Sequence, residues 1–156
     1  MQRVGIVTDS TVCLPKELLE LYGIQVVPMY LIFEGKVYRD GPVMSHSDFY
    51  ALLRKAKQLP TTSPSSPGTY LEAYRQASQR AESILCITIT PKVITMYNAA
   101  RLAMEEAREA LPNVPITVLD SRTAANAQGF IVLEAARAAK AGLGLPEVTR
   151  VAEGLI

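Results

Sequence analysis

Short apolar runs rich in β-branched residues alternate along the chain with segments of helical periodicity, and this alternation constrains the fold most strongly. The predicted strands are Val4–Val7, Ile24–Phe33, Ser83–Thr88 and Val114–Leu119, with a short Val37–Tyr38 strand that forms a hairpin with the second of them. The predicted helices are Lys16–Tyr22, a segment capped by Ser45, Thr69–Arg80, Thr95–Leu111, Ala124–Ala141 and Pro146–Ile156. Strands that are apolar enough to be buried on both faces, separated by helices, are typical of parallel sheets. We therefore predict an α/β fold in which a mostly parallel sheet carries helices on both faces.

The last segment of the sequence indicates how the domain is bounded. Pro146–Ile156 has helical periodicity, with an apolar stripe formed by Val148, Val151, Ala152 and Leu155. We expect nothing in this chain to cover the stripe. We therefore expect residues 1–145 to form one domain, and residues 146–156 to begin a linker or helix that leads to a second domain absent from this chain.

Charge and composition exclude several classes of protein. Sixteen Lys and Arg against 15 Asp and Glu give a net charge of +1, and only 6% of residues are aromatic, which argues against a nucleic-acid-binding protein. No apolar run reaches the roughly 20 residues of a membrane span, and the first residues lack the long apolar region typical of a secretory leader. We therefore expect a cytoplasmic protein. Cys13 and Cys86 are expected to be buried thiols, and no metal site or cofactor is predicted.

Hydroxyl-bearing side chains gather where the predicted strands end, which is where ligands bind in open α/β sheets. These segments are Thr8–Thr11, Thr61–Ser66, which we predict to be a loop, Thr90–Thr95 and Asp120–Thr123. Hydroxyl donors beside free N–H groups at helix starts suit a carboxylate or a phosphate. Taken singly, each segment is more typical of a helix cap, but the five hydroxyls in Thr61–Ser66 exceed what one cap requires. Asp9 is equally suited to bracing its loop and to contacting a ligand.

Motifs for nucleotide binding and for nucleophilic catalysis are absent from the sequence. It contains neither GxxxxGK[ST] nor GxGxxG, and no Ser/His/Asp or Cys/His set can be assembled around His46, the single histidine. We therefore expect a binding protein rather than an enzyme.

An ordered set of short motifs resembles the DegV family from about Val4 to Ala141. The motifs are Val7-Thr8-Asp9-Ser10-Thr11, Val26-Val27-Pro28-Met29, Tyr38-x-Asp40, Phe49-Tyr50-x-x-Leu53, Thr62-Ser63 and Val118-x-Asp120-Ser121. The resemblance implies a fatty-acid-binding protein of two domains, with the acyl chain in an apolar tunnel between them and its carboxylate held by hydroxyls. Some members of the family are the acyl-carrying subunit of a bacterial fatty acid kinase, so a kinase is an expected partner.

The resemblance also assigns site residues. Thr62, followed by Ser63, occupies the position of the family's carboxylate-binding threonine. Ile94 stands at the position of a second carboxylate-binding residue, a serine in the family, and Thr95 is the nearest hydroxyl that could replace it. Ala125 and Ala127 replace a serine and a glycine. The residues expected to support the site are Asp9, Ser10, Ser66, Asp120 and Ser121.

The residues and the family resemblance together suggest three competing hypotheses for the function. The first is a carrier that binds a long-chain fatty acid and presents it to a kinase. The second is a divergent binder of another small anionic ligand, suggested by Ile94, Ala125 and Ala127. The third is an enzyme for a small substrate, with Asp9 and Asp120 as acid and base. If the tunnel needs a second domain, the isolated chain is expected to expose an apolar face and to self-associate.

Overall fold

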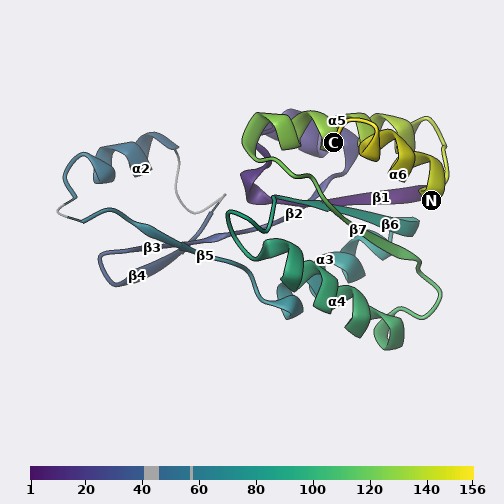
Figure 1. Cartoon of the computed structure of the whole chain (residues 1–156), viewed down its shortest axis with the longest axis horizontal. Helices are drawn as coiled ribbons and strands as arrows, with labels where there is room; N and C mark the ends of the chain where they lie inside the picture. Colours follow the sequence, from purple (N-terminus) through teal and green to yellow (C-terminus); the bar gives the residue numbers. More distant parts are fainter. Residues whose placement is uncertain (41–45, 57) are drawn as a thin grey trace.

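The structure is a computed structural model that describes residues 1–40, 46–56 and 58–156. Four parallel strands form its central sheet. The strands are β1 (Gln2–Asp9), β2 (Gln25–Val27), β6 (Ala81–Thr88) and β7 (Ile116–Asp120), in the order β2-β1-β6-β7 (Figure 1). The two central strands, β1 and β6, each end in six consecutive buried residues, because helices cover both faces. The predicted parallel α/β sheet is confirmed.

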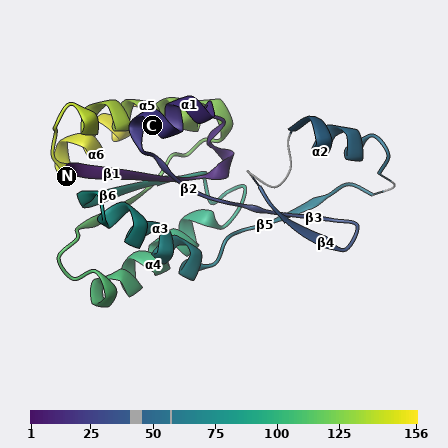
Figure 2. The same ribbon diagram turned by 180° about the vertical axis from the view of Figure 1, so that it is seen from behind.

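The helices divide between the two faces of the sheet. Helices α1 (Lys16–Tyr22), α5 (Ala125–Lys140) and α6 (Leu145–Glu153) lie on one face, and α3 (Pro67–Ser78) and α4 (Met96–Ala110) lie on the other (Figures 1 and 2). Alternate residues of the central strands supply the two cores. Ile6 and Leu85 join the core beneath α5, whereas Val7 and Cys86 join the core with α3 and α4.

The C-terminal helix α6 packs on the same domain. Val148 and Ala152 are fully buried in the core with α5, while Val151 and Leu155 are exposed. The expectation that nothing in this chain covers the apolar stripe is therefore wrong for two of its four residues. The turn before α6, where Gly142 has a φ of 88°, reverses the chain so that α6 lies against α5.

A second, antiparallel sheet projects from the carboxyl ends of the parallel strands (Figure 1). It contains β3 (Tyr30–Phe33), β4 (Lys36–Arg39) and β5 (Thr61–Ser63), in the order β4-β3-β5. Helix α2 (His46–Leu53) lies between β4 and β5 in sequence, and the predicted cap Ser45 lies outside the described residues. We call the described residues from 30 to 63 the arm.

The arm corrects one sequence prediction and confirms another. The single strand predicted over Ile24–Phe33 is two strands in different sheets, separated at Pro28, whose missing N–H cannot continue a ladder. The predicted hairpin is present, with Glu34 and Gly35 at positive φ in its turn.

The two cysteines have different environments. Cys86 is buried in β6, as predicted, but Cys13 is exposed. Cys13 directly follows the 3-10 turn η1 (Ser10–Val12) and has a φ of 46°, so it lies on the surface of a tight turn and not in the core. The prediction that both thiols are buried is therefore wrong for Cys13.

Candidate functional site at the carboxyl edge

The hydroxyl-rich segments predicted from the sequence lie around the carboxyl ends of β1, β6 and β7, and around the base of the arm. Helices α4 and α5 begin at the same edge, because each follows a parallel strand. Some of these side chains make hydrogen bonds within the protein, and others keep polar groups free to bind a ligand.

Asp9, at the end of β1, is a bracing residue. Its side chain is fully buried. One carboxylate oxygen accepts a hydrogen bond from the Ile89 amide at 2.7 Å, and the other accepts from the Thr11 amide and the Gln128 Nε2, both at 3.2 Å, and from the Thr11 hydroxyl. Burial raises the pKa of the Asp9 carboxyl above its ordinary value, and these hydrogen bonds oppose the shift. The carboxylate therefore ties β1 to the loop after β6 and to α5.

Gln128, which is not among the predicted site residues, is a structural partner of Asp9. It is fully buried, and its Nε2 donates to the Thr8 hydroxyl at 3.1 Å as well as to Asp9. Its Oε1 accepts from the Thr11 hydroxyl at 2.9 Å. A polar residue on the otherwise apolar inner face of α5 was the available signal.

Ser10 connects the sheet to the arm. Its hydroxyl donates to Asp40 Oδ2 at 2.7 Å and accepts from the Met29 amide at 2.9 Å. The Asp40 amide in turn donates to the Met29 carbonyl at 2.8 Å. These three hydrogen bonds join Ser10, Met29 and Asp40 at the point where the arm leaves the domain.

Three further predicted supporting residues stabilise turns and a helix start. Ser66 caps α3 by accepting from the Thr69 amide at 3.3 Å. Asp120 accepts from the Arg122 amide at 2.8 Å. The Ser121 hydroxyl donates to the Thr123 carbonyl at 3.1 Å. For these three residues, the helix-cap and turn interpretation explains the contacts.

Thr62 and Ser63 point to opposite faces of the arm sheet. Thr62 pairs with Leu31, which pairs on its other side with Tyr38, so these three side chains share one face. Ser63 shares the other face with Tyr30 and with Arg39, which pairs with Tyr30. Thr62 is exposed, and its hydroxyl makes no hydrogen bond to any residue within the described ranges.

Thr95 and Ile94 lie at the start of α4, on the body of the domain. Ile94 is half-buried and packs against the core beneath α4. Thr95 is exposed at the N-cap position, and its side chain makes no capping hydrogen bond. Among the predicted site residues in the described part of the chain, Thr62 and Thr95 thus share an exposed hydroxyl that the protein does not use itself.

Ala125 and Ala127, at the first turn of α5, are both exposed. Ala125 has a φ of 54°, a left-handed conformation that favours glycine. Neither side chain offers a hydrogen-bond donor, so the α5 end of the edge contributes only backbone groups at these positions.

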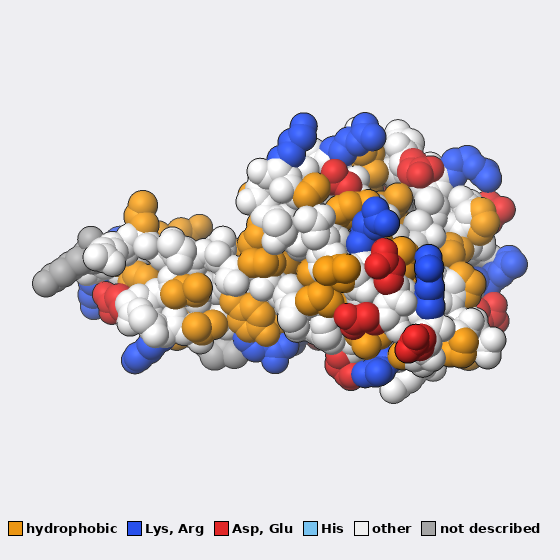
Figure 3. All heavy atoms as spheres, turned by 60° about the horizontal axis from the view of Figure 1, so that its bottom comes forward, with side chains coloured by type: hydrophobic (Ala, Val, Ile, Leu, Met, Phe, Trp, Pro, Cys, Tyr) orange, Lys and Arg blue, Asp and Glu red, His pale blue; other side chains and the backbone are white. Residues whose placement is uncertain are grey.

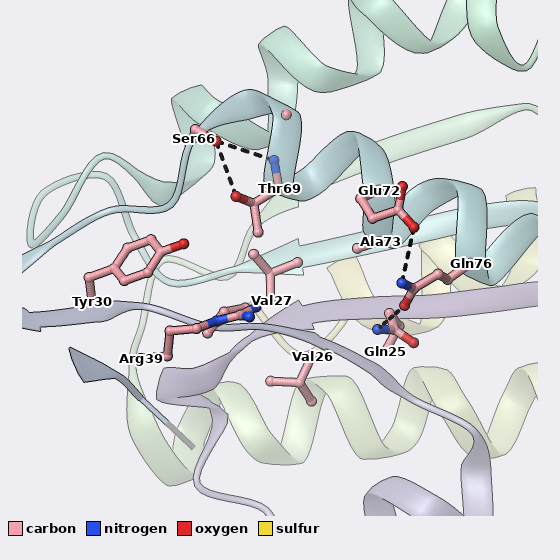
Figure 4. Close-up of a pocket in the computed structure, with 12 residues that line it drawn as sticks. Gln25, Val26, Val27, Tyr30, Arg39, Ser66, Thr69, Glu72, Ala73 and Gln76 are labelled. Carbon is pink, nitrogen blue, oxygen red and sulfur yellow. Dashed lines mark hydrogen bonds between the residues drawn. The ribbon is translucent and has the colours of Figure 1, made fainter. Parts of the chain in front are cut away.

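A pocket of about 430 Å³ lies between the arm, the edge strand β2 and α3 (Figure 4). Tyr30 and Arg39 line its arm side. Gln25, Gln76 and Glu72 line its far end, where Gln25 donates a hydrogen bond to Gln76 at 2.9 Å and Gln76 donates to Glu72 at 3.1 Å. The two arm residues that line the pocket belong to the Ser63 face of the arm sheet, and the lining does not include Thr62 or Thr95. The sequence analysis did not predict this pocket.

Two kinds of feature are absent from the described residues. None of the helices there combines the length and apolar character needed to cross a bilayer. Within the same residues, no three His, Cys, Asp or Glu side chains gather in a way that could hold a metal ion.

Comparison with known proteins identifies a family and its fold. The family model for DegV proteins, which describes them as uncharacterised, matches residues 3–156. A DegV domain-containing protein of Caldanaerobacter subterraneus is 35% identical over 148 residues, which are 95% of this chain and 51% of the relative. The chain spans about half the length of the curated relatives it matches.

Solved structures agree with this assignment. A DegV family protein of Thermus thermophilus, described as fatty-acid binding, is 33% identical with a TM-score of 0.86, and the match covers 98% of this chain and 53% of that one. DegV of Bacillus subtilis, described as a fatty acid binding protein, is 27% identical with a TM-score of 0.86, over 99% of this chain and 53% of that one.

Proposed function

The chain belongs to the DegV family, and on that premise we propose that it carries the head-group end of a fatty-acid-binding site. In this proposal the hydroxyls of Thr62 and Thr95 donate hydrogen bonds to the ligand carboxylate. The single observation that carries it is that these two predicted site residues keep exposed hydroxyls without partners in the described part of the chain, while the supporting residues are engaged inside the protein.

The chemistry of these donors suits a monoanionic head group. A neutral hydroxyl can hold a carboxylate without a fixed positive charge, and each hydrogen bond to a charged acceptor contributes roughly 1.5–3 kcal/mol. The first N–H groups of α4 face the same edge and favour negative charge. The tail then supplies most of the affinity, at about 0.8 kcal/mol for each methylene removed from water.

Apolar surface for the tail is available on the arm and beside it. Exposed apolar side chains include Val37 and Tyr50 on the arm, and Val93 just before α4. Figure 3 shows hydrophobic side chains along the arm and at its junction with the body, whereas the face over the body alternates Lys and Arg with Asp and Glu. The described relatives that bind fatty acids support the same ligand class.

Two further elements belong to the proposal. We propose that a second domain follows residues 146–156 and covers the tail, since the matched relatives are about twice as long as this chain. We also propose that the bound acyl group is presented to a kinase, with this protein acting as a carrier and not as the catalyst.

The geometry gives little support to an acid–base pair of Asp9 and Asp120. Strands β1 and β7 lie on either side of β6, so the two residues end strands that are not neighbours. Asp9 is also fully buried, and protein donors occupy both of its carboxylate oxygens. A binder of another small anionic ligand remains the second candidate, because Ile94 and Ala125 replace family serines.

The proposal is tested by comparing two ligands with the same tail. Binding of oleate and of methyl oleate is measured by titration calorimetry for the parent chain, for Thr62→Val and for Thr61→Val. Thr61 is the matched control, because it is an exposed threonine on the same strand with its side chain on the opposite face.

We expect Thr62→Val to weaken oleate binding roughly tenfold or more and to leave methyl oleate unchanged, since only the carboxylate uses the hydroxyl. Thr61→Val should bind both ligands like the parent. Loss of oleate binding in both variants, or in neither, would remove Thr62 from the site. A parent chain that binds short anions but neither lipid would favour the second candidate.

A further inference from the structure

We propose that Ser10 and Asp40 are positioning residues that fix the arm, and with it the Thr62 hydroxyl, relative to the carboxyl edge of the sheet. The inference rests on the proposed function only in assuming that the Thr62 hydroxyl binds the ligand carboxylate. We call the hydrogen-bonded group formed by Ser10, Met29 and Asp40 the latch.

The arm needs such a contact because its own sheet does not continue the central sheet. Strands β3, β4 and β5 pair only with one another in the described part of the chain, in a sheet separate from β2-β1-β6-β7. The chain passes between the two sheets at Pro28–Met29 and again at Pro64–Ser65. Figures 1 and 2 show from both sides that the arm stands away from the helices that cover the parallel sheet. Its direction is therefore set by the contacts at its base.

The latch lies at that base and joins three separate parts of the chain. Ser10 follows the last residue of β1, Met29 precedes β3, and Asp40 follows β4. One hydroxyl makes both bridges, by donating to the Asp40 carboxylate at 2.7 Å and accepting from the Met29 amide at 2.9 Å. The bond from the Asp40 amide to the Met29 carbonyl, 2.8 Å long, closes the group. The latch thus fixes both strands of the hairpin at the end nearest the body.

The body side of the latch is rigid. Asp9, the neighbour of Ser10, is fully buried and bonded to the Ile89 amide and to Gln128. These bonds tie the start of the 3-10 turn to the loop after β6 and to α5. Ser10 is therefore presented from a fixed point and can define a direction for the arm.

The arm side of the latch leads directly to Thr62. Arg39, next to Asp40, pairs across the sheet with Tyr30, and Tyr30 pairs with Ser63 on β5. Thr62 is the neighbour of Ser63 and pairs with Leu31. A rotation of the hairpin about its base would move β5 with it, because three registered pairs hold β5 to β3.

Ser65 fixes the second point, Pro64–Ser65, at which the chain passes between the arm and the body, through hydrogen bonds that do not involve the arm. Its hydroxyl donates to the Pro28 carbonyl, and its amide donates to Met96 Sδ at 3.2 Å. Both partners lie outside the arm, so these bonds fix the crossing to the body. The latch is the contact in which a side chain of the body, Ser10, holds a side chain next to β4.

Selectivity for the ligand head group follows from this arrangement. A hydrogen bond weakens steeply when the donor and acceptor move beyond hydrogen-bond distance. Apolar contacts with the tail have no such directional requirement. Loss of the latch should therefore weaken binding of a carboxylate and spare binding of an uncharged lipid with the same tail.

The test combines a distance measurement that needs no ligand with a binding measurement. In a Cys13→Ser background, spin labels are attached at Val37→Cys on the arm and Glu106→Cys on α4, both exposed positions. Pulsed electron resonance then gives the distribution of distances between arm and body. The variants are Ser10→Ala, Asp40→Ala and Asp40→Asn, and the control is Ser78→Ala, whose hydroxyl bonds Arg75 at the end of α3. Oleate and methyl oleate binding are measured for the same variants without labels.

We expect Ser10→Ala and Asp40→Ala to broaden or shift the distance distribution and to weaken oleate binding roughly tenfold, with methyl oleate binding unchanged. Asp40→Asn keeps an oxygen that accepts from Ser10 and should restore both readouts. Removal of the Asp40 charge alone would strengthen binding of an anion, which is opposite to the expected loss. Ser78→Ala should resemble the parent.

Unchanged distances and unchanged oleate binding in Ser10→Ala would overturn the proposal. Equal weakening of both ligands would also overturn it, because a shift of the arm should disturb the directional hydrogen bond to the carboxylate more than the apolar contacts with the tail. If the parent chain bound no oleate, the proposed function would fail, and the distances would still decide whether the latch holds the arm.

Discussion

The Asp9 carboxyl is fully buried, so its ionisation affects the stability of the domain. Burial raises its pKa above the ordinary value of 3.8, which is its value in the unfolded chain. Between 3.8 and the raised value, the folded protein holds a proton that the unfolded chain has released. This group therefore favours folding more as the pH falls through that window, and its contribution becomes constant below 3.8.

We predict that the free energy of unfolding of the parent, minus that of Asp9→Asn, increases as the pH is lowered from neutrality towards 3.8. The subtraction removes the titration of the other carboxyl groups. Urea unfolding across this pH range measures both curves. Parallel curves would contradict the raised pKa.

Tyr70 and Tyr74, two buried tyrosines on α3, form a matched pair for a second prediction. The Tyr74 hydroxyl donates to the Ala100 carbonyl at 3.0 Å, whereas the Tyr70 hydroxyl has no hydrogen-bond partner among the described residues. Tyr74→Phe should lower the free energy of unfolding by about 1 kcal/mol. Tyr70→Phe should leave it unchanged or raise it by up to about 1 kcal/mol, because it removes a buried polar atom without a partner. A larger loss in Tyr70→Phe than in Tyr74→Phe would show that Tyr70 has a partner.

At the residue scale, the sequence predicted where hydroxyls gather but not which of them stay free. Asp9 was suited equally to bracing and to ligand contact, and only its burial among Ile89, Thr11 and Gln128 decides for bracing. The Gln128 partner is over a hundred residues away, so the polar position on α5 was visible in the sequence but its pairing with Asp9 was not. The face on which Thr62 points follows from strand register, which depends on pairing with Leu31.

At the scale of elements, α5 approaches the η1 turn closely at Gly129. A Cβ on Gly129 would lie 2.6 Å from the Val12 carbonyl oxygen, so the helix and the turn could not keep their present distance. The turn carries Ser10, and hence this packing also supports the latch.

We predict that Gly129→Ala lowers the free energy of unfolding by about 1–3 kcal/mol, although alanine is the better helix former. Gly68→Ala is the control, because a Cβ there meets Ser66 Oγ at an ordinary 3.7 Å in the first turn of α3. Chemical unfolding of both variants gives the comparison. A stabilised Gly129→Ala would mean that α5 can move away from η1 without loss.

The elements themselves were largely predictable, and the sheet to which each belongs was not. The helices α3, α4 and α5 agree with the predicted ranges within a few residues, because their apolar periodicity is local. The run Ile24–Phe33 was predicted as one strand, since β propensity does not show that the chain changes sheets at Pro28. Thr61–Ser63 was predicted as a loop and is the strand β5, whose pairing partner β3 lies about thirty residues earlier.

At the scale of the whole molecule, α6 is part of the folded domain. Val148 on α6 is fully buried against the core beneath α5, while Val151 on the same helix is exposed. The start of a second domain after residue 145 was inferred from an apolar stripe, and half of that stripe is buried within this chain. The boundary remains a prediction.

We predict that Val148→Ala lowers the free energy of unfolding by about 2 kcal/mol, because it removes buried methyl groups and leaves a cavity. Val151→Ala should change it by less than about 0.5 kcal/mol. Thermal unfolding of the two variants distinguishes them. Similar values would indicate that α6 is not docked as described.

Our central proposal is that the free hydroxyls of Thr62 and Thr95 hold a carboxylate at the edge of the sheet. Carbon NMR of oleate labelled at its carboxyl carbon observes that group directly. We predict that the parent chain shifts the carboxyl resonance and that the double variant Thr62→Val, Thr95→Val does not, although both proteins fold alike. An equal shift with the double variant, or no shift with the parent, would contradict the claim.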